Sequence, residues 1–168
     1  MRTSKILSGV SAGVLLALAG GAYAASPATT TFLVTATVAP NCTVAATPLA
    51  FGAFTGVDIT TPTSTITVNC TALTGYGIAL DVGTGGGSYA ARTMTNGGTG
   101  TLVYNLFTTT ARNVVWGDDS GSTDIITGSG SGMGTPKTHT VYGSLLAANN
   151  PNAESGSYAS TINVTVSY

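Results

Sequence analysis

A two-residue alternation of apolar and polar side chains is the feature that most restricts how this chain can fold. From residue 161 to residue 168, odd positions hold Thr, Asn or Ser, whereas the even positions are apolar: Ile162, Val164, Val166 and Tyr168. Successive side chains of a β-strand point to opposite faces of a sheet, so this spacing predicts a strand with one apolar face. No helical i, i+3, i+4, i+7 pattern persists beyond residue 24. We therefore expect an all-β chain.

Short segments of the same kind recur along the chain. The sequence predicts strands over Cys42–Val44 with Leu49–Phe54, Ser64–Thr71, Tyr76–Val82, Ala90–Thr95, Thr101–Thr108, Asn113–Trp116, Thr138–Leu146 and Tyr158–Tyr168. Glycine- and serine-rich stretches separate them, and the longest, Gly117–Gly134, is expected to be a loop. Seven or eight short strands at this spacing are typical of a β-sandwich.

Residues 1–24 have the pattern of a secretory signal peptide. Arg2 and Lys5 make a basic start, Ile6–Leu18 is apolar, and Ala22-Tyr23-Ala24 is a small-residue cleavage site. This stretch is too short, and wrongly flanked, for a membrane anchor. We expect an exported mature chain of 144 residues (168 − 24), which is the size of one domain.

Charged residues are scarce. After cleavage three basic residues, Arg92, Arg112 and Lys137, are scattered among six acidic ones, which excludes the basic cluster of a nucleic-acid or anionic-membrane binder. Only 7% of residues are charged, against roughly 25% in typical soluble domains. Two explanations stay open: a secreted protein with a Thr, Ser, Asn and Gly surface, or a protein whose surface is largely covered by copies of itself.

The mature chain keeps two cysteines, Cys42 and Cys70. In an oxidising compartment we expect them to form a disulfide. The closed loop of about 28 residues would stabilise the fold by about 3.5 kcal/mol in the chain-entropy model. A metal site would need four ligands, which two distant cysteines and the single histidine, His139, do not supply.

No catalytic set is visible. With one histidine and no G-x-S-x-G motif, a Ser-His-Asp triad has no support. Asp118, Asp119 and Asp124 do not follow the ligand order of a Ca²⁺ loop, so we expect a solvated loop there. His139 is expected on the surface and Trp116 in the core. We predict that the protein is not an enzyme and has no cofactor, no metal and no small-molecule substrate.

The segment Thr29–Val38 alternates as a strand does but has no neighbour. Its even positions from residue 32 are Phe32, Val34, Ala36 and Val38, and Pro40-Asn41 ends it without a hairpin turn. A terminal strand must pair with an edge of its own chain or of another. At the other end of the sequence, no later strand covers the outer edge of Tyr158–Tyr168. The sequence thus has one spare strand and one uncovered edge.

Several motifs occur in an order that spans the mature chain: Phe32-x-Val34-x-x-x-Val38, Cys42-Thr43-Val44, Leu49-x-Phe51-Gly52, Val68-x-Cys70-Thr71, Tyr104-Asn105-Leu106-Phe107, Trp116-Gly117-Asp118, Tyr142-Gly143 and Gly156-x-Tyr158-x-x-x-Ile162-x-Val164-x-Val166-x-Tyr168. With them the chain resembles the spore coat protein U domain family, the subunit family of archaic (Csu-type) chaperone–usher pili.

This resemblance implies an incomplete immunoglobulin-like Greek-key sandwich that lacks its final strand. Residues 25–41 would be an N-terminal donor-strand segment and residues 42–168 the pilin domain. The donor side chains would be Phe32, Val34, Ala36 and Val38, with Ala36 making a shallow contact. The acceptor-groove edge, which also faces the chaperone, would carry Tyr158, Ile162, Val164, Val166 and Tyr168.

The predicted function is a structural pilus subunit that polymerises by donor-strand complementation into an extracellular fibre for surface attachment and biofilm formation. Its partners would be neighbouring pilus subunits, a periplasmic chaperone and an outer-membrane usher. It would pass through the periplasm to a pilus on the cell surface. Two alternatives remain: a secreted monomeric β-sandwich binding module, or a coat or matrix protein of the same fold.

Overall fold

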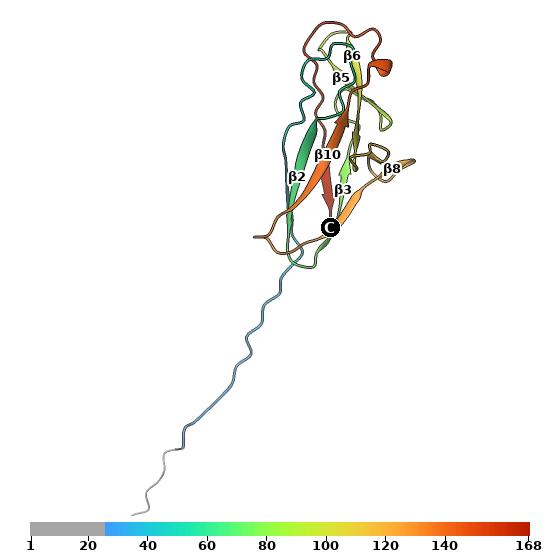
Figure 1. The fold of residues 1–168 in the computed structure, drawn as a ribbon. Coiled ribbons are helices and arrows are strands. Elements are labelled where there is room, and N and C mark those ends of the chain that lie inside the picture. The colour runs from blue at the N-terminus through green and yellow to red at the C-terminus, as the bar shows by residue number, and fades with distance from the viewer. Residues whose placement is uncertain (1–25) are drawn as a thin grey trace, which may run out of the picture. The chain divides into compact units, whose positions relative to one another are not determined.

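The computed structural model of the protein describes residues 26–168, so the predicted signal peptide lies outside the described residues. The chain divides into a unit ending at Ala36 and a unit of residues 37–168, and each is described by itself. The described part of the second unit contains these elements (Figure 1): β1 (Cys42–Ala46), β2 (Thr63–Cys70), β3 (Gly75–Leu80), β4 (Gly87–Ser88), β5 (Ala91–Thr95), β6 (Thr101–Phe107), β7 (Val115–Trp116), β8 (Thr123–Asp124), β9 (Ile126–Ser129), β10 (Lys137–Ser144), the 3-10 helix η1 (Ala147–Asn149) and β11 (Val164–Ser167).

The strands form two sheets. The first has the order β1-β2-β10-β6-β5-β4, with β7 paired to β6 and β8 to β7. The second has the order β11-β3-β9. All pairs are antiparallel except β7 with β8, and Figure 1 shows β2 and β10 running alongside each other. The all-β class predicted from the alternation is confirmed.

The order of strands is that of an immunoglobulin-like sandwich. In such a fold one sheet has strands A, B, E and D, and the other has C, F and G. Here β1, β2, β10 and β6 follow the first order, while β3 and β11 take the places of C and F. Within residues 26–168, β11 pairs only with β3, so no strand stands in the place of G. The sandwich is therefore incomplete, as the sequence predicts.

The core lies between the sheets and follows the alternation. On β2 the side chains of Ile66, Val68 and Cys70 are buried, and the residues between them are only partly covered. Trp116 is fully buried, which confirms its predicted core position, and its indole Nε1 donates a hydrogen bond to the carbonyl of Ile78.

Three elements differ from the expectation. The stretch expected to be a loop at 117–134 contains β8 and β9, and β9 pairs with β3. The expected strand at 49–54 is absent, and the last strand is confined to Val164–Ser167 with one bridge between Thr95 and Ala159. Both segments line the groove described below, and on the side that faces the groove their backbone groups have no strand partner in the described chain.

Arg92 is a buried cation that holds the two sheets together. From β5 its guanidinium donates hydrogen bonds to the carbonyl of Asp81, just beyond β3, and to the carbonyl of Trp116 on β7. It also donates to the side-chain oxygen of Asn105. Burial lowers the pKa of Arg92. The sequence showed Arg92 only as an isolated basic residue. Its buried position was not predicted, because the carbonyl groups that accept its hydrogen bonds are distant from it in sequence.

Candidate binding groove

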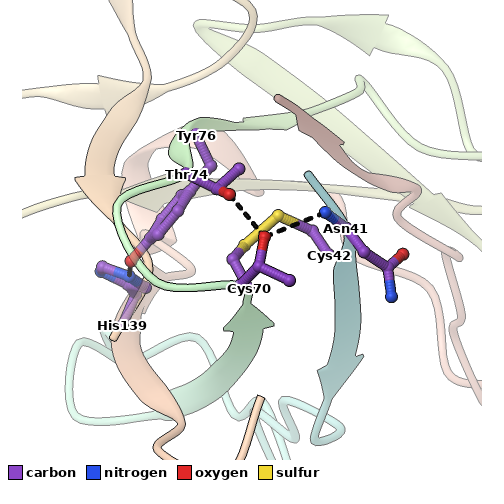
Figure 2. Close-up of a disulfide and its surroundings, with 7 residues drawn as sticks. Asn41, Cys42, Cys70, Thr74, Tyr76 and His139 are labelled. Atoms are coloured by element: carbon purple, nitrogen blue, oxygen red, sulfur yellow. Dashed lines mark hydrogen bonds between the residues drawn. A yellow bond between two sulfur atoms is a disulfide. The ribbon is translucent and has the colours of Figure 1, made fainter. Parts of the chain in front are cut away.

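The expected disulfide between Cys42 and Cys70 is present and closes the first strand pair. Cys42 of β1 lies opposite Cys70 of β2 with a Cα–Cα distance of 4.1 Å (Figure 2). Just before it, Asn41 and Thr71 bond reciprocally, with Asn41 N–H donating to Thr71 Oγ1 and Thr71 N–H to the Asn41 carbonyl. The disulfide and these two hydrogen bonds together fix the start of β1 against the end of β2.

A groove of about 1170 Å³ runs along the open side of the sandwich. One wall is formed by residues 46–54, which continue from β1, and the other by residues 153–162 with Val164 of β11. The floor is the buried core: Ile66, Leu80, Met94, Leu102, Tyr104, Leu106, Val141 and Leu145. The groove therefore leads directly to the apolar interior between the sheets.

The first wall has free backbone groups. The amide of Thr47 donates to the carbonyl of Thr65, but no residue from 48 to 58 makes a backbone–backbone hydrogen bond within the described chain. Its apolar side chains, Leu49, Phe51 and Phe54, pack against the core and are only partly buried. Gly143 allows this close approach, because a Cβ there would meet Leu49 at 3.0 Å and Phe51 at 3.1 Å.

The second wall presents a free strand edge. The amide of Asp81 donates to the carbonyl of Asn163, and the ladder continues with Val164 opposite Leu80. In an antiparallel pair the hydrogen-bonded positions alternate. Asn163, Thr165 and Ser167 thus bond to β3, and the N–H and C=O groups of Ile162, Val164 and Val166 point to the opposite edge, where no strand of residues 26–168 pairs.

The residues expected on this edge are only partly brought together. Tyr158, Ile162 and Val164 are half-buried and line the groove. Val166 is half-buried and packs against the core, but it is not part of the groove lining. Tyr168 is 60% exposed and also lies outside the lining.

The residues expected on the donor strand lie in a segment without secondary structure. Residues 26–41 contain no helix or strand. Among them, Asn41 accepts a backbone hydrogen bond, from the amide of Thr71. The exposed fractions are 86% for Phe32, 77% for Val34 and 80% for Val38, and Ala36 is exposed as well. Large apolar side chains are rarely gathered in one exposed segment of a soluble chain.

His139 is not the surface residue expected from the sequence. It is half-buried on β10, and its Nε2 lies 3.0 Å from the hydroxyl of Tyr76 on β3, close to the disulfide (Figure 2). Burial lowers the pKa of His139 and raises that of Tyr76. The expectation was wrong because the pairing of β10 with β2 brings this side chain over the first residues of β3.

The acidic loop offers no metal centre among the described residues. Asp118, Asp119 and Asp124 are exposed, and Asp118 accepts hydrogen bonds from the amide and hydroxyl of Ser120. These bonds lower the pKa of Asp118. No cluster of three or more His, Cys, Asp or Glu side chains suited to a metal occurs in residues 26–168. In the same residues, no helix is long and apolar enough to cross a membrane.

Comparison with known proteins assigns the fold and the family. The model of the Spore Coat Protein U domain family matches residues 28–165, and the chain belongs to this family. Among solved structures, it is similar to one described as the CsuC–CsuE chaperone–tip adhesion subunit pre-assembly complex from archaic chaperone–usher Csu pili of Acinetobacter baumannii. The TM-score is 0.56 at 20% identity, covering 79% of this chain and 41% of that chain. No curated protein matches the sequence.

Sequence reasoning identified the second wall of the groove but not the first. The first wall is predicted to be a strand, and the signal against a strand is Pro48 with Gly52, which precede and interrupt the apolar run Leu49-x-Phe51-x-x-Phe54. Apolar residues that are neither in a strand nor in a helix can line a groove, and here they do.

Proposed function

We propose that the protein is a structural pilus subunit that polymerises by strand addition. The N-terminal segment of one copy, residues 29–38, would insert between the two walls of the groove of another copy. The observation that carries this proposal is the groove itself, an apolar channel between two backbone edges that lack partners in the described chain. Adding a strand to such an edge is a recurrent mode of peptide recognition.

The dimensions of donor and acceptor agree. The donor residues 32–38 and the segment 158–164, in which all residues except Asn163 line the groove, are both seven residues long. At about 3.3 Å per residue each spans about 20 Å. The donor places Phe32, Val34, Ala36 and Val38 on one face, and most of the groove floor is apolar.

Apolar burial and backbone hydrogen bonding both favour the assembly. Burial of one Phe and two Val stabilises the complex by about 5–8 kcal/mol before the cost of ordering the segment. Backbone hydrogen bonds to Ile162 and Val164 on one side, and to residues 48–54 on the other, add to this. The bonds also remove the penalty of leaving these groups unpaired in a partly apolar groove.

A fibre follows from the geometry of the contact. Donor and acceptor are different surfaces of the same chain, so each copy can give one strand and receive another. Such a head-to-tail contact propagates as a chain of subunits unless it closes into a ring. The 7% content of charged residues fits a surface that is largely covered by further copies.

The partners of this proposal are neighbouring subunits, a periplasmic chaperone and an outer-membrane usher. The groove exposes core residues, so a subunit on its way to the fibre would need a temporary strand from a chaperone. The similar structure from Acinetobacter baumannii is described as a chaperone–subunit complex, which supports this partner. The subunit would reach the cell surface as part of a pilus that serves attachment and biofilm formation.

Co-expression with an archaic chaperone and usher tests the proposal. The full-length chain should give a ladder of SDS-resistant oligomers in unheated samples, and deletion of residues 29–38 should abolish the ladder. An unchanged ladder from the deletion variant would overturn the proposal. A folded, monomeric mature chain obtained without any chaperone would instead favour the secreted binding module.

A further inference from the structure

The second wall of the groove has a small, polar side chain, that of Ser160, between larger ones. The side chains of residues 158, 160, 162 and 164 are all half-buried, but Ser160 is small and polar between Tyr158 and Ile162. Its Oγ accepts a hydrogen bond from the amide of Gly85 at 3.2 Å. A Cβ added at Gly83 would lie 2.6 Å from this Oγ, so the turn before Gly85 packs directly against it.

At the same level the floor is at its bulkiest. Tyr104 lines the groove, and its ring meets that of Phe51 on the first wall edge-on at a centroid distance of 6.0 Å. Its hydroxyl is buried and has no hydrogen-bond partner among the described residues. Burial raises the pKa of Tyr104, and the hydroxyl of Ser160 lies near the Tyr104 hydroxyl without making a hydrogen bond to it. At this point along the groove, Tyr104 contributes an aromatic ring from the floor and Phe51 contributes one from the first wall. On the second wall, Ser160 is the small residue that faces them.

We propose that Tyr104, Phe51 and Ser160 form a narrow, polar level of the groove that accepts only a small residue of the inserted strand. Resting on the proposed function, the occupant is the N-terminal segment of a second copy, and the small residue is Ala36. It is the only small side chain on the donor face, between Val34 and Val38. Ala36, which the sequence predicted to make a shallow contact, is then the residue that sets the register of the inserted strand.

The register follows from this single match. With Ala36 opposite Ser160 and the strands antiparallel, Val38 lies opposite Tyr158, Val34 opposite Ile162 and Phe32 opposite Val164. Each donor side chain then meets a residue that lines the groove. Ile162 and Val164 are also the positions whose backbone groups point to this edge, as hydrogen-bonded pairs require.

The parallel alternative fits less well. With Ala36 again opposite Ser160, a parallel strand would place Phe32 opposite Gly156. Residues 153–157 are exposed, form no strand and contain Glu154, Ser155 and Ser157. The largest donor side chain would then lie against a polar loop rather than over the core. The antiparallel register therefore defines which segments the groove accepts: large, large, small and large residues at successive alternate positions.

Peptide binding tests the selectivity. Fluorescein-labelled peptides of residues 29–38 are added to the full-length mature protein purified as its complex with an archaic chaperone, and replacement of the chaperone by the peptide is followed by fluorescence anisotropy. Ala36→Leu should weaken binding by about 5- to 150-fold, the usual effect of overpacking, whereas Val34→Leu should have a much smaller effect. Ala36→Ser should bind at least as well as the unmodified peptide, and Val34→Ser should bind less well. Equal effects at positions 34 and 36 would overturn the inference.

A cross-link tests the register independently of affinity. Ser160→Cys protein is mixed with peptides that carry Cys in place of Val34, Ala36 or Val38, under mild oxidation. Directly opposite residues have the Cα separation that a disulfide requires, so the peptide with Ala36→Cys should cross-link fastest. Faster capture at either neighbouring position would overturn the register. If the unmodified peptide does not bind at all, the proposed function fails and this inference with it; if it binds without selectivity at position 36, only this inference fails.

Discussion

Truncation of Phe32 separates binding of the donor segment from stability of the domain. The side chain of Phe32 is 86% exposed, so almost all of its apolar surface is available to be buried in a second copy. In the antiparallel register it lies opposite Val164, whose partner on β3 is the buried floor residue Leu80. Full burial of a Phe side chain is worth about 1.5–3 kcal/mol, so Phe32→Ala should weaken binding by about 10- to 150-fold.

Leu33 provides a matched control. It is as apolar as Phe32 and is 87% exposed, but it occupies an odd position and so points to the other face of the strand. Leu33→Ala should therefore change the affinity by less than about threefold, the scatter expected of surface substitutions. If the affinity depended only on the apolar content of the peptide, the two substitutions would weaken binding equally. If the strand inserts into the groove with one face, only Phe32→Ala weakens binding strongly.

The assay is the same anisotropy titration, with peptide variants and an unchanged full-length acceptor. Because the acceptor is the same throughout, any competition from its own N-terminal segment affects every titration equally and cancels in the ratio of apparent Kd values. In the full-length chain, neither substitution should shift the thermal unfolding of the domain, since both side chains are in water. Equal losses for Phe32→Ala and Leu33→Ala would refute the reasoning.

Three further predictions concern the scaffold of the groove. Replacing Cys42 and Cys70 together by Ser should lower the free energy of unfolding by about 3.5 kcal/mol, as measured by urea denaturation, because the closed loop spans 28 residues; an unchanged midpoint would contradict this. Because burial lowers the folded-state pKa of His139, the unfolded chain takes up its proton first, so stability should fall as the pH drops below about 6.5. His139→Asn should remove that dependence, and an identical slope in the variant would show that another group is responsible. Gly83→Ala should destabilise the second wall by about 1–3 kcal/mol, since φ is +82° and the added Cβ meets Ser160 at 2.6 Å; native thermal stability in the variant would argue against a role for this turn.

Most of the fold could be predicted because alternation is a local signal. The buried positions of β2, β3 and β6 follow the period of two almost residue by residue. The pairing of Cys42 with Cys70 followed from export and from their number. The segments that failed, 49–54 and 158–163, have suitable residues for strands, but residues 49–54 make no backbone–backbone hydrogen bond within residues 26–168 and residues 158–163 make only scattered ones, to Thr95, Thr84 and Asp81. A strand is defined by its partner as much as by its sequence.

The candidate site was only half visible for a related reason. The donor face and the apolar residues of the second wall were apparent, because each lies in one continuous segment. Buried Arg92, the Tyr76–His139 hydrogen bond and the level at Tyr104 and Ser160 were not, because each joins residues far apart in sequence. Such contacts depend on which strands become neighbours, and the period of a strand does not specify its neighbours.

Moving the donor segment within the chain tests the central claim most directly. In the antiparallel register residue 168 lies opposite residue 28, so residues 28–38, which are the donor segment and the residue before it, can be transferred to follow Tyr168 through a two-residue Asn-Gly hairpin turn that keeps this register. A matched control carries the same transfer with Phe32→Asp and Val34→Asp. Thermal unfolding and sedimentation of the two proteins are compared. The account predicts that the transferred segment fills its own groove and gives a monomer that melts well above the control. Equal melting temperatures of the two proteins would contradict it.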